Sequence, residues 1–130
     1  MLVPFLAVCL LGLHGPVKPT VTIIATLKAA SKVPDPKAIA PYKNALVSGD
    51  YIVEKIVSGK DSHVKSGQVV RVFRLGIVKG SKTAIGKVKK GTKLNLALKP
   101  LTDWPEMERE FQADDLPVTD TTFYFVEVQK

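Results

Sequence analysis

Apolar side chains at every second position are the feature that most limits how this chain can fold. The segment VTIIATLKAAS places four of them on one face of an extended strand, and TKLNLALKP places three. These residues are Val21, Ile23, Ala25, Leu27, Leu94, Leu96 and Leu98. Because successive side chains of a strand point to opposite faces, a period of two indicates half-buried strands.

Three more segments are typical of strands because they are rich in Val, Ile and aromatic residues: NALVSGDYIVEKIVSG, QVVRVFRLGIVKG and TTFYFVEV. Pro34, Pro36 and Pro41 exclude a long helix between the first two strands. Only TDWPEMEREF indicates a helix, since Asp103 and Glu106 have the spacing of a capping box. Five or six strands with one short helix predict an all-β barrel or sandwich.

A small five- or six-stranded barrel, an OB-like Greek key, is the preferred architecture. A chain of 130 residues is long enough for one domain. We expect residues 20–130 to form the barrel and residues 1–19 to be a signal peptide or membrane anchor with its linker.

The segment NALVSGDYIVEKIVSG is apolar on both of its faces, so it is expected to be a central strand. Gly49 should supply a bend or bulge. Val53 and Ile56 are both predicted to be buried, whereas Glu54 and Lys55 should lie where the strand emerges towards solvent.

Residues 2–13, LVPFLAVCLLGL, form an apolar run without charge. The run has the length of a signal-peptide apolar region and is shorter than the about 20 residues that span a bilayer. It predicts an extracytoplasmic protein, located in the periplasm or cell envelope, secreted, or anchored through residues 2–13. A buried N-terminal helix or strand is the alternative, because no basic residue precedes the run. Cys9 is the only cysteine, which excludes an intrachain disulfide.

The net charge of +7 is unevenly distributed. Residues 16–100 carry 17 Lys and Arg against 4 acids, and residues 101–130 carry 2 against 8. The two parts therefore either complement each other within the fold or leave a basic surface for an anionic partner.

The segment KGSKTAIGKVKKGTK is expected to be a Lys-rich hairpin that presents a binding surface or is simply solvated. Its candidate binding residues are Lys82, Lys87, Lys89, Lys90 and Lys93. No aromatic residue lies between Phe73 and Trp104, so the segment lacks faces on which bases stack. The predicted function is an accessory binding or scaffolding module for an envelope protein or anionic polysaccharide. An OB-type nucleic-acid-binding domain in the cytoplasm is the alternative.

Trp104 is a further candidate binding residue, forming an apolar patch with Met107 and Phe111. The alternative is that Trp104 packs in the core. Replacing it would separate the two, because a core tryptophan costs stability and a binding residue costs affinity.

No residue pattern indicates catalysis, a metal or a cofactor. Asp61, Ser62 and His63 are consecutive, and three consecutive residues cannot line up a nucleophile, a base and an orienting group. His63 is expected to be a solvated loop residue. The acidic residues after Pro100 lack the spacing of a calcium loop. We therefore expect no enzyme; an esterase or sugar-modifying activity that depends on His63 is the alternative.

Three features of the chain form a recognisable pattern: IAPYKNAL, then Tyr51, Val53 and Gly59 in the next strand, and finally DWPEMERE. On these residues, the segment 20–128 resembles an uncharacterised extracytoplasmic β-domain of planctomycete-like bacteria. In that family the domain is similar to modules found beside alginate O-acetyltransferase and SGNH-hydrolase-like proteins. The resemblance implies a β fold and an exported protein, and it implies no catalytic residue.

Overall fold

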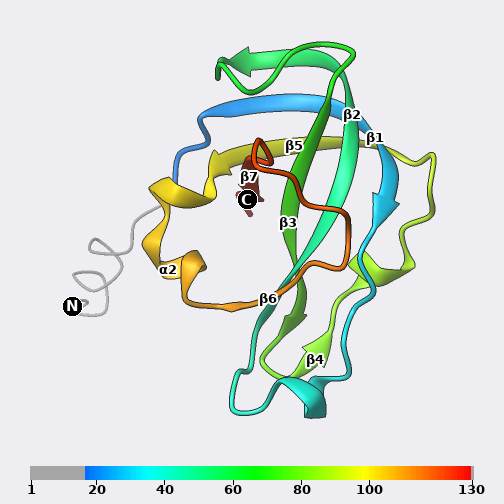
Figure 1. Cartoon of the computed structure of the whole chain (residues 1–130), viewed down its shortest axis with the longest axis vertical. Coiled ribbons are helices and arrows are strands. Elements are labelled where there is room, and N and C mark those ends of the chain that lie inside the picture. Colours follow the sequence, from blue (N-terminus) through cyan, green and yellow to red (C-terminus); the bar gives the residue numbers. More distant parts are fainter. Residues whose placement is uncertain (1–16, 130) are drawn as a thin grey trace, which may run out of the picture.

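The computed structural model describes residues 17–129, which form a seven-stranded sheet that closes into a barrel (Figure 1). The strands are β1 (Val21–Ala30), β2 (Ala45–Gly59), β3 (Val69–Val78), β4 (Ser81–Lys82), β5 (Lys93–Pro100), β6 (Phe111–Ala113) and β7 (Tyr124–Glu127). The helical segments are the 3-10 turns η1 (Pro36–Ile39), η2 (Ala84–Lys87) and η3 (Leu101–Asp103) and the helix α2 (Pro105–Glu108).

Five of the strands make the barrel wall. β1, β2 and β3 follow one another as antiparallel neighbours, and β3 lies parallel to β7. β5 lies antiparallel to both β7 and β1, which closes the sheet. The two short strands extend it at β3 (β4) and at β2 (β6). The prediction of a small OB-like Greek-key barrel with one short helix is confirmed.

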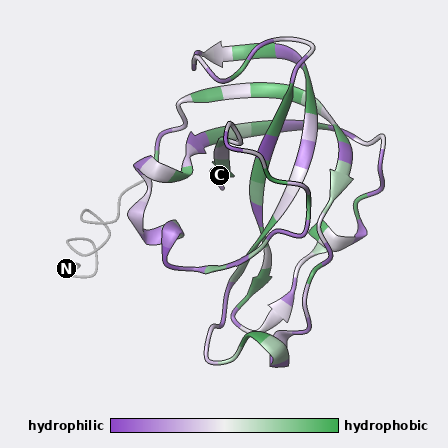
Figure 2. Ribbon diagram, in the orientation of Figure 1, coloured by the Kyte–Doolittle hydropathy of each residue, from purple (hydrophilic) through white to green (hydrophobic). Residues whose placement is uncertain are grey.

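The predicted alternation fills the barrel interior. Val21, Ile23, Ala25 and Leu27 of β1 are buried, as are Leu96 and Leu98 of β5, while Leu94 is partly buried against them. The other strands add Tyr51, Val53, Val70, Val72 and Phe125 to this core. Figure 2 shows the corresponding hydrophobic residues along the strands, interrupted by hydrophilic ones.

The C-terminal half of β2 departs from the expected pattern. Val53 is buried and Glu54 and Lys55 are exposed, as predicted, but the prediction that Ile56 is buried is wrong, because Ile56 is only half-buried. Glu54 and Val57 are extra residues relative to β1, so each makes a bulge in the β1–β2 pairing. Bulges bend and twist a strand, which turns this end of β2 away from the core.

Gly49 has a role other than the expected bulge. It pairs regularly with Val72 of β3, and the nearby irregularity in the β1–β2 pairing is an extra residue in β1, Lys28. A Cβ atom at Gly49 would lie 3.0 Å from Cε1 of Tyr51. The absence of a side chain at Gly49 therefore lets the Tyr51 ring lie against the strand inside the barrel.

The segment from η3 to β6 covers the outer face of β3 and β7. It places Leu101, Trp104 and Met107 against a second buried cluster, which consists of Leu46, Phe73 and Val126. Each of these three barrel residues comes from a different strand, β2, β3 or β7. The segment thus buries the apolar side chains of β2, β3 and β7 that point away from the barrel interior.

The predicted capping box is wrong. Trp104 is the N-cap of α2 and no side chain caps the helix, which is a single turn after Pro105. The chain leaves the helix because Phe111 begins β6, which pairs in parallel with β2 from Ala45 to Val47. Pairing with an available strand edge satisfies the backbone of this segment, and the helix ends before it.

Residues 2–13, on which the export or anchoring prediction depends, lie outside the described residues, as do Cys9 and His14. Between residues 17 and 129 no helix has the length and apolar character needed to cross a membrane. The predicted location stays a prediction.

Candidate functional site

Arg71 organises a charged cluster on the outer face of β3. Its side chain is only 8% exposed, and its Nε donates to Oδ1 of Asp50 at 2.5 Å. Nη1 donates to Oδ1 of Asp114 at 3.3 Å and Nη2 donates to the carbonyl of Pro117 at 2.6 Å. One guanidinium therefore ties β2 to the segment that follows β6.

Asp114 collects further hydrogen bonds. The hydroxyls of Ser48 and Tyr124 each donate to it at 2.6 Å, and Ser48 shares a 2.6 Å hydrogen bond with Ser31. Burial raises the pKa of Tyr124, and the hydrogen bond to Asp114 adds to this effect. Asp114 is one of the acidic residues after Pro100, and in the structure it is a largely buried acceptor of several hydrogen bonds.

A second ion pair lies inside one end of the barrel. Nε of Arg74 donates to Oε1 of Glu127 at 2.9 Å, with the two side chains 13% and 15% exposed. Nη1 of Arg74 is buried and has no hydrogen-bond partner among residues 17–129. Burial raises the pKa of Tyr51 nearby, and the charge of Arg74 opposes that shift. Asp114 and Glu127 come from the acidic C-terminal part of the chain, and Arg71 and Arg74 come from its basic part. Part of the charge of the two parts is therefore neutralised within the fold.

The lysine-rich segment is not the single hairpin that the sequence predicts. β4 makes a two-residue pairing with β3, after which η2 and a turn lead into β5. Thr83 breaks the strand because its hydroxyl donates to the carbonyl of Leu75 at 2.7 Å and accepts from the N–H of Ile85 at 3.3 Å. The lysines are consequently spread over a strand, a 3-10 turn and a loop.

Four of the five candidate lysines lie on β4, on η2 and in the turn that follows η2. Lys82, Lys87, Lys89 and Lys90 are exposed. Lys93 lies apart on β5, where Nζ is 3.2 Å from Oε1 of Glu54. No other lysine in the described part of the chain forms an ion pair.

Two lysines from β1 and its continuation join the four. The N–H of Gly91 donates to the carbonyl of Leu27 at 2.8 Å, which places the turn after η2 beside Lys28. Lys32 lines the same pocket as Lys82 and Lys87. We call this group the lysine end; its members are Lys28, Lys32, Lys82, Lys87, Lys89 and Lys90.

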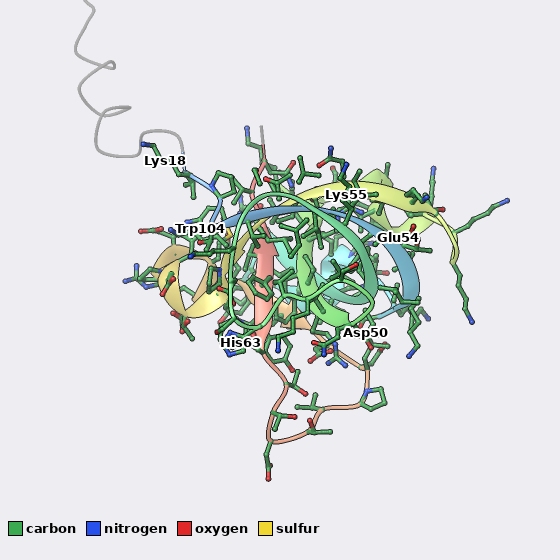
Figure 3. The ribbon with its side chains drawn as sticks, turned by 90° about the horizontal axis from the view of Figure 1, so that it is seen from above. Lys18, Asp50, Glu54, Lys55, His63 and Trp104 are labelled. Carbon is green, nitrogen blue, oxygen red and sulfur yellow. The ribbon has the colours of Figure 1, made fainter. Side chains whose placement is uncertain are left out.

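Trp104 is not part of the lysine end. It is half-buried against Leu46, Phe73 and Val126. In Figure 1, the helix α2 that follows it and the connection from η2 to β5 lie on opposite sides of the barrel. Seen from above, Trp104 and Glu54 are likewise on opposite sides (Figure 3). Met107 packs against the same buried cluster as Trp104, whereas Phe111 packs in a different cluster with Ile39.

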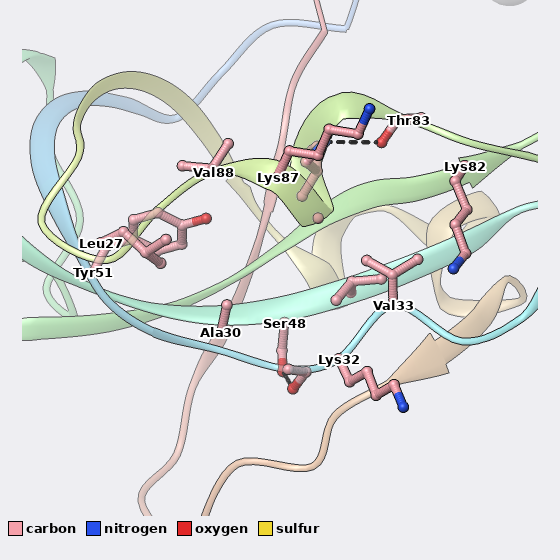
Figure 4. Close-up of a pocket in the computed structure, with 14 residues that line it drawn as sticks. Leu27, Ala30, Lys32, Val33, Ser48, Tyr51, Lys82, Thr83, Lys87 and Val88 are labelled. Atoms are coloured by element: carbon pink, nitrogen blue, oxygen red, sulfur yellow. Dashed lines mark hydrogen bonds between the residues drawn. The ribbon is translucent and has the colours of Figure 1, made fainter.

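A pocket of about 370 Å³ opens at the lysine end (Figure 4). Its walls come from the end of β1, from β2 and from η2, and they are mainly apolar. Tyr51 lies at one end of this pocket and Lys82 at the other. No local sequence pattern indicates the pocket, because its lining residues are distant in the chain.

A second pocket, of about 420 Å³, lies between the β2–β3 connection and the loop before β7. It is lined by polar groups such as Gln68, Thr119 and Thr122, together with His63 and Phe123. The ring of His63 stacks on Phe123, with the ring centroids 3.6 Å apart and an angle of 4° between the planes. His63 is thus exposed, as expected, but it is packed against the barrel.

The surroundings of His63 differ from those of a catalytic triad. Nδ1 is 2.9 Å from Oδ1 of Asp61, and the hydroxyl of Ser62 is 3.5 Å from the same nitrogen. A triad uses one ring nitrogen for the carboxylate and the other for the nucleophile. Within residues 17–129, no three His, Cys, Asp or Glu side chains are grouped so that they could hold a metal ion.

Comparison with known proteins assigns no function to the candidate site. The resemblance to an extracytoplasmic β-domain of planctomycete-like bacteria stays a prediction. No protein-family model, no curated protein and no solved structure matches the chain.

Proposed function

We propose that this protein is a non-catalytic binding module whose lysine end holds an acidic polysaccharide of the cell envelope. The observation that carries the proposal is the distribution of charge. The acids Asp50, Asp114 and Glu127 are engaged by Arg71 and Arg74, whereas the lysines at one end of the barrel are exposed and have no carboxylate partner among the described residues.

A group of unpaired cations raises the local concentration of anions and holds a polyanion by the sum of weak interactions. Each exposed pair contributes little, roughly 0.2–1 kcal/mol, so a polymer that meets several lysines at once is favoured over a single small anion at this surface. The lysines come from β1, β4, η2 and the following turn, so the spacing between their charges is irregular. Such a surface suits a repeating carboxylate or sulfate more than one defined group.

Nucleic acid is less well suited to this end of the barrel. Binding of single strands relies on aromatic faces on which bases stack. Among the described aromatic residues only Tyr42 is largely exposed, at 48%, and none lines the pocket at the lysine end except the buried Tyr51. The cytoplasmic nucleic-acid-binding alternative is tested in the same experiment.

The envelope location is supported by the apolar run at residues 2–13, and the non-catalytic role by the arrangement around His63. If the esterase alternative were correct, His63→Ala would abolish hydrolysis of a generic ester. Cell fractionation of a C-terminally tagged chain tests the location, and recovery of the full-length protein from the cytoplasm alone would contradict it.

The binding test compares a fluorescent polygalacturonate oligosaccharide with a single-stranded oligothymidylate of equal charge, by anisotropy at two salt concentrations. The variant Lys87→Gln, Lys89→Gln, Lys90→Gln removes three charges from the lysine end. We expect it to weaken polygalacturonate binding about tenfold, since three exposed charges of about 0.5 kcal/mol each add to roughly one factor of ten. Added salt should weaken the wild type more than the variant.

The matched control is Lys55→Gln, Lys60→Gln, Lys65→Gln, which makes the same charge change on β2 and the β2–β3 connection. It should reduce affinity by less than about threefold. Equal losses in the two variants would mean that net charge alone is responsible and would contradict the proposal. Tighter binding of the oligothymidylate than of the glycan would favour the nucleic-acid alternative instead.

A further inference from the structure

We propose that the pocket at the lysine end is a binding site for a small amphipathic acid, such as a medium-chain carboxylic acid. This inference goes beyond the proposed function, because it concerns one small molecule enclosed in a pocket and not a polymer on the surface. It rests on the lining of the pocket, the charge at its rim and one polar group within it.

The body of the pocket is apolar. Its apolar lining residues come from β1 (Leu27), from the segment after β1 (Val33), from β2 (Val47) and from η2 with the residue after it (Ile85 and Val88). The volume of about 370 Å³ lies in the lower part of the range for small-molecule sites, about 300–1,000 Å³. A hydrocarbon chain or ring that enters removes apolar surface from water on both sides, which favours binding.

The rim determines the charge of the ligand. Lys32, Lys82 and Lys87 line the pocket from three separate segments, and no Asp or Glu lines it. Two acids lie behind the lining: Asp115 accepts a hydrogen bond of 3.1 Å from the backbone N–H of Lys32, and Asp114 accepts one of 2.6 Å from the hydroxyl of Ser48 and is paired with Arg71. Three ammonium groups around an apolar opening favour a ligand with an anionic end and disfavour one with a cationic end.

Tyr51 adds a polar group inside. In Figure 4 its ring lies beside Leu27, and its hydroxyl points towards the space enclosed by Val88 and Ser48. The side chain of Arg74 interacts with Tyr51 and lowers the pKa of its hydroxyl, against the larger effect of burial. The absence of a side chain at Gly49 leaves room for the ring in this position. The hydroxyl thus adds a polar group at this end of the pocket.

The test measures binding of decanoate, decanol and decyltrimethylammonium to the full chain, by isothermal titration calorimetry below their micellar concentrations. We expect saturable one-to-one binding of decanoate. Decanol should bind about tenfold more weakly because it lacks the charge that the lysines meet. The cationic compound should not bind. Binding of all three with similar affinity, or no saturable binding of decanoate, would overturn the proposal.

Ala30→Leu locates the binding site. Ala30 is exposed and lines the pocket, so a leucine there fills the pocket without changing any charge. Ala84→Leu is the matched control, because Ala84 is exposed on η2 and does not line the pocket. Ala30→Leu should weaken decanoate binding about tenfold or more, and Ala84→Leu should leave it unchanged. Equal affinities in the two variants would contradict the proposed location.

Gly86→Ala provides a second route if Ala30→Leu lowers the melting temperature. A Cβ at Gly86 would lie 2.9 Å from Cγ2 of Val33, so Val33 must move, and decanoate binding should again weaken. Ala30→Leu keeps every lysine and should leave polygalacturonate binding intact. Loss of decanoate binding and loss of polysaccharide binding therefore arise in different variants, and either proposal can fail without the other.

Discussion

Replacing Arg71 with leucine tests whether the charged cluster holds the chain after β6 to the barrel. The guanidinium meets carboxylates of Asp50 and Asp114 and the carbonyl of Pro117. Leucine fills part of the same volume but donates no hydrogen bond. The variant therefore leaves two neighbouring carboxylates without their cation and one carbonyl without its donor.

The expected loss follows from the burial of the three side chains. Arg71 is 8% exposed, Asp50 18% and Asp114 14%. Removing one partner of a buried ion pair costs about 3–5 kcal/mol. Because the carboxylates retain some contact with water, we expect the lower end of that range, about 3 kcal/mol. A loss of that size is a large part of the total stability of a small domain, about 5–15 kcal/mol.

Equilibrium unfolding in urea, followed by circular dichroism, measures the change in the free energy of unfolding. Arg109→Leu is the control, because Arg109 is exposed and should change stability by less than about 0.5 kcal/mol. Adding Asp114→Asn to Arg71→Leu should recover part of the loss, since it removes one of the two stranded charges. If Arg71→Leu lies within about 1 kcal/mol of the wild type, the cluster does not stabilise the fold and the reasoning is refuted.

Three further predictions concern the barrel itself. Val53→Ala should destabilise the protein by about 2 kcal/mol in urea unfolding, whereas Ile56→Ala should cost only about 1 kcal/mol because that side chain is half-buried. Gly49→Val should lower stability by about 1–3 kcal/mol and change the near-ultraviolet circular dichroism, because the new side chain displaces the ring of Tyr51; equal spectra would contradict this. Tyr124→Phe should cost about 2 kcal/mol at neutral pH through the lost hydrogen bond to a carboxylate. Since the folded state raises the pKa of Tyr124 above 10.0, the contribution of Tyr124 to stability should be fully present below pH 10 and be lost as the pH rises further, so the fall in stability above pH 10 should be smaller in Tyr124→Phe.

The sequence predicts the barrel wall well because the wall depends on local pattern. A strand with one face in the core must alternate, and the alternation in β1 and β5 identifies both the strands and their inward residues. The prediction for Ile56 is wrong for a reason that no single segment contains. Glu54 and Val57 become bulges only because β1 offers fewer residues to pair with, and that mismatch belongs to two strands together.

The helix and the site show the same limit. Asp103 and Glu106 have the spacing of a capping box, yet the segment follows the free edge of β2 and forms β6 instead of a longer helix. The lysines are visible in the sequence as a run. The sequence does not show that these lysines lie near Lys32 at an apolar pocket. That arrangement depends on hydrogen bonding between the turn after η2 and the end of β1.

The different placement of arginine and lysine connects the fold to the proposed function. Arg71 and Arg74 each use a planar, multidentate guanidinium to satisfy carboxylates where water is scarce, a task to which an ammonium group is poorly suited. In these pairs the largely buried arginines neutralise Asp50, Asp114 and Glu127. The exposed lysines then determine the field at one end of the molecule, and an ammonium on a flexible stem can follow the irregular spacing of charges on a polymer. Exchanging arginine and lysine at single positions should show the difference. Arg71→Lys should destabilise the barrel, because one ammonium nitrogen cannot replace three guanidinium nitrogens that donate to three separate acceptors. Lys89→Arg should leave both stability and polysaccharide binding nearly unchanged.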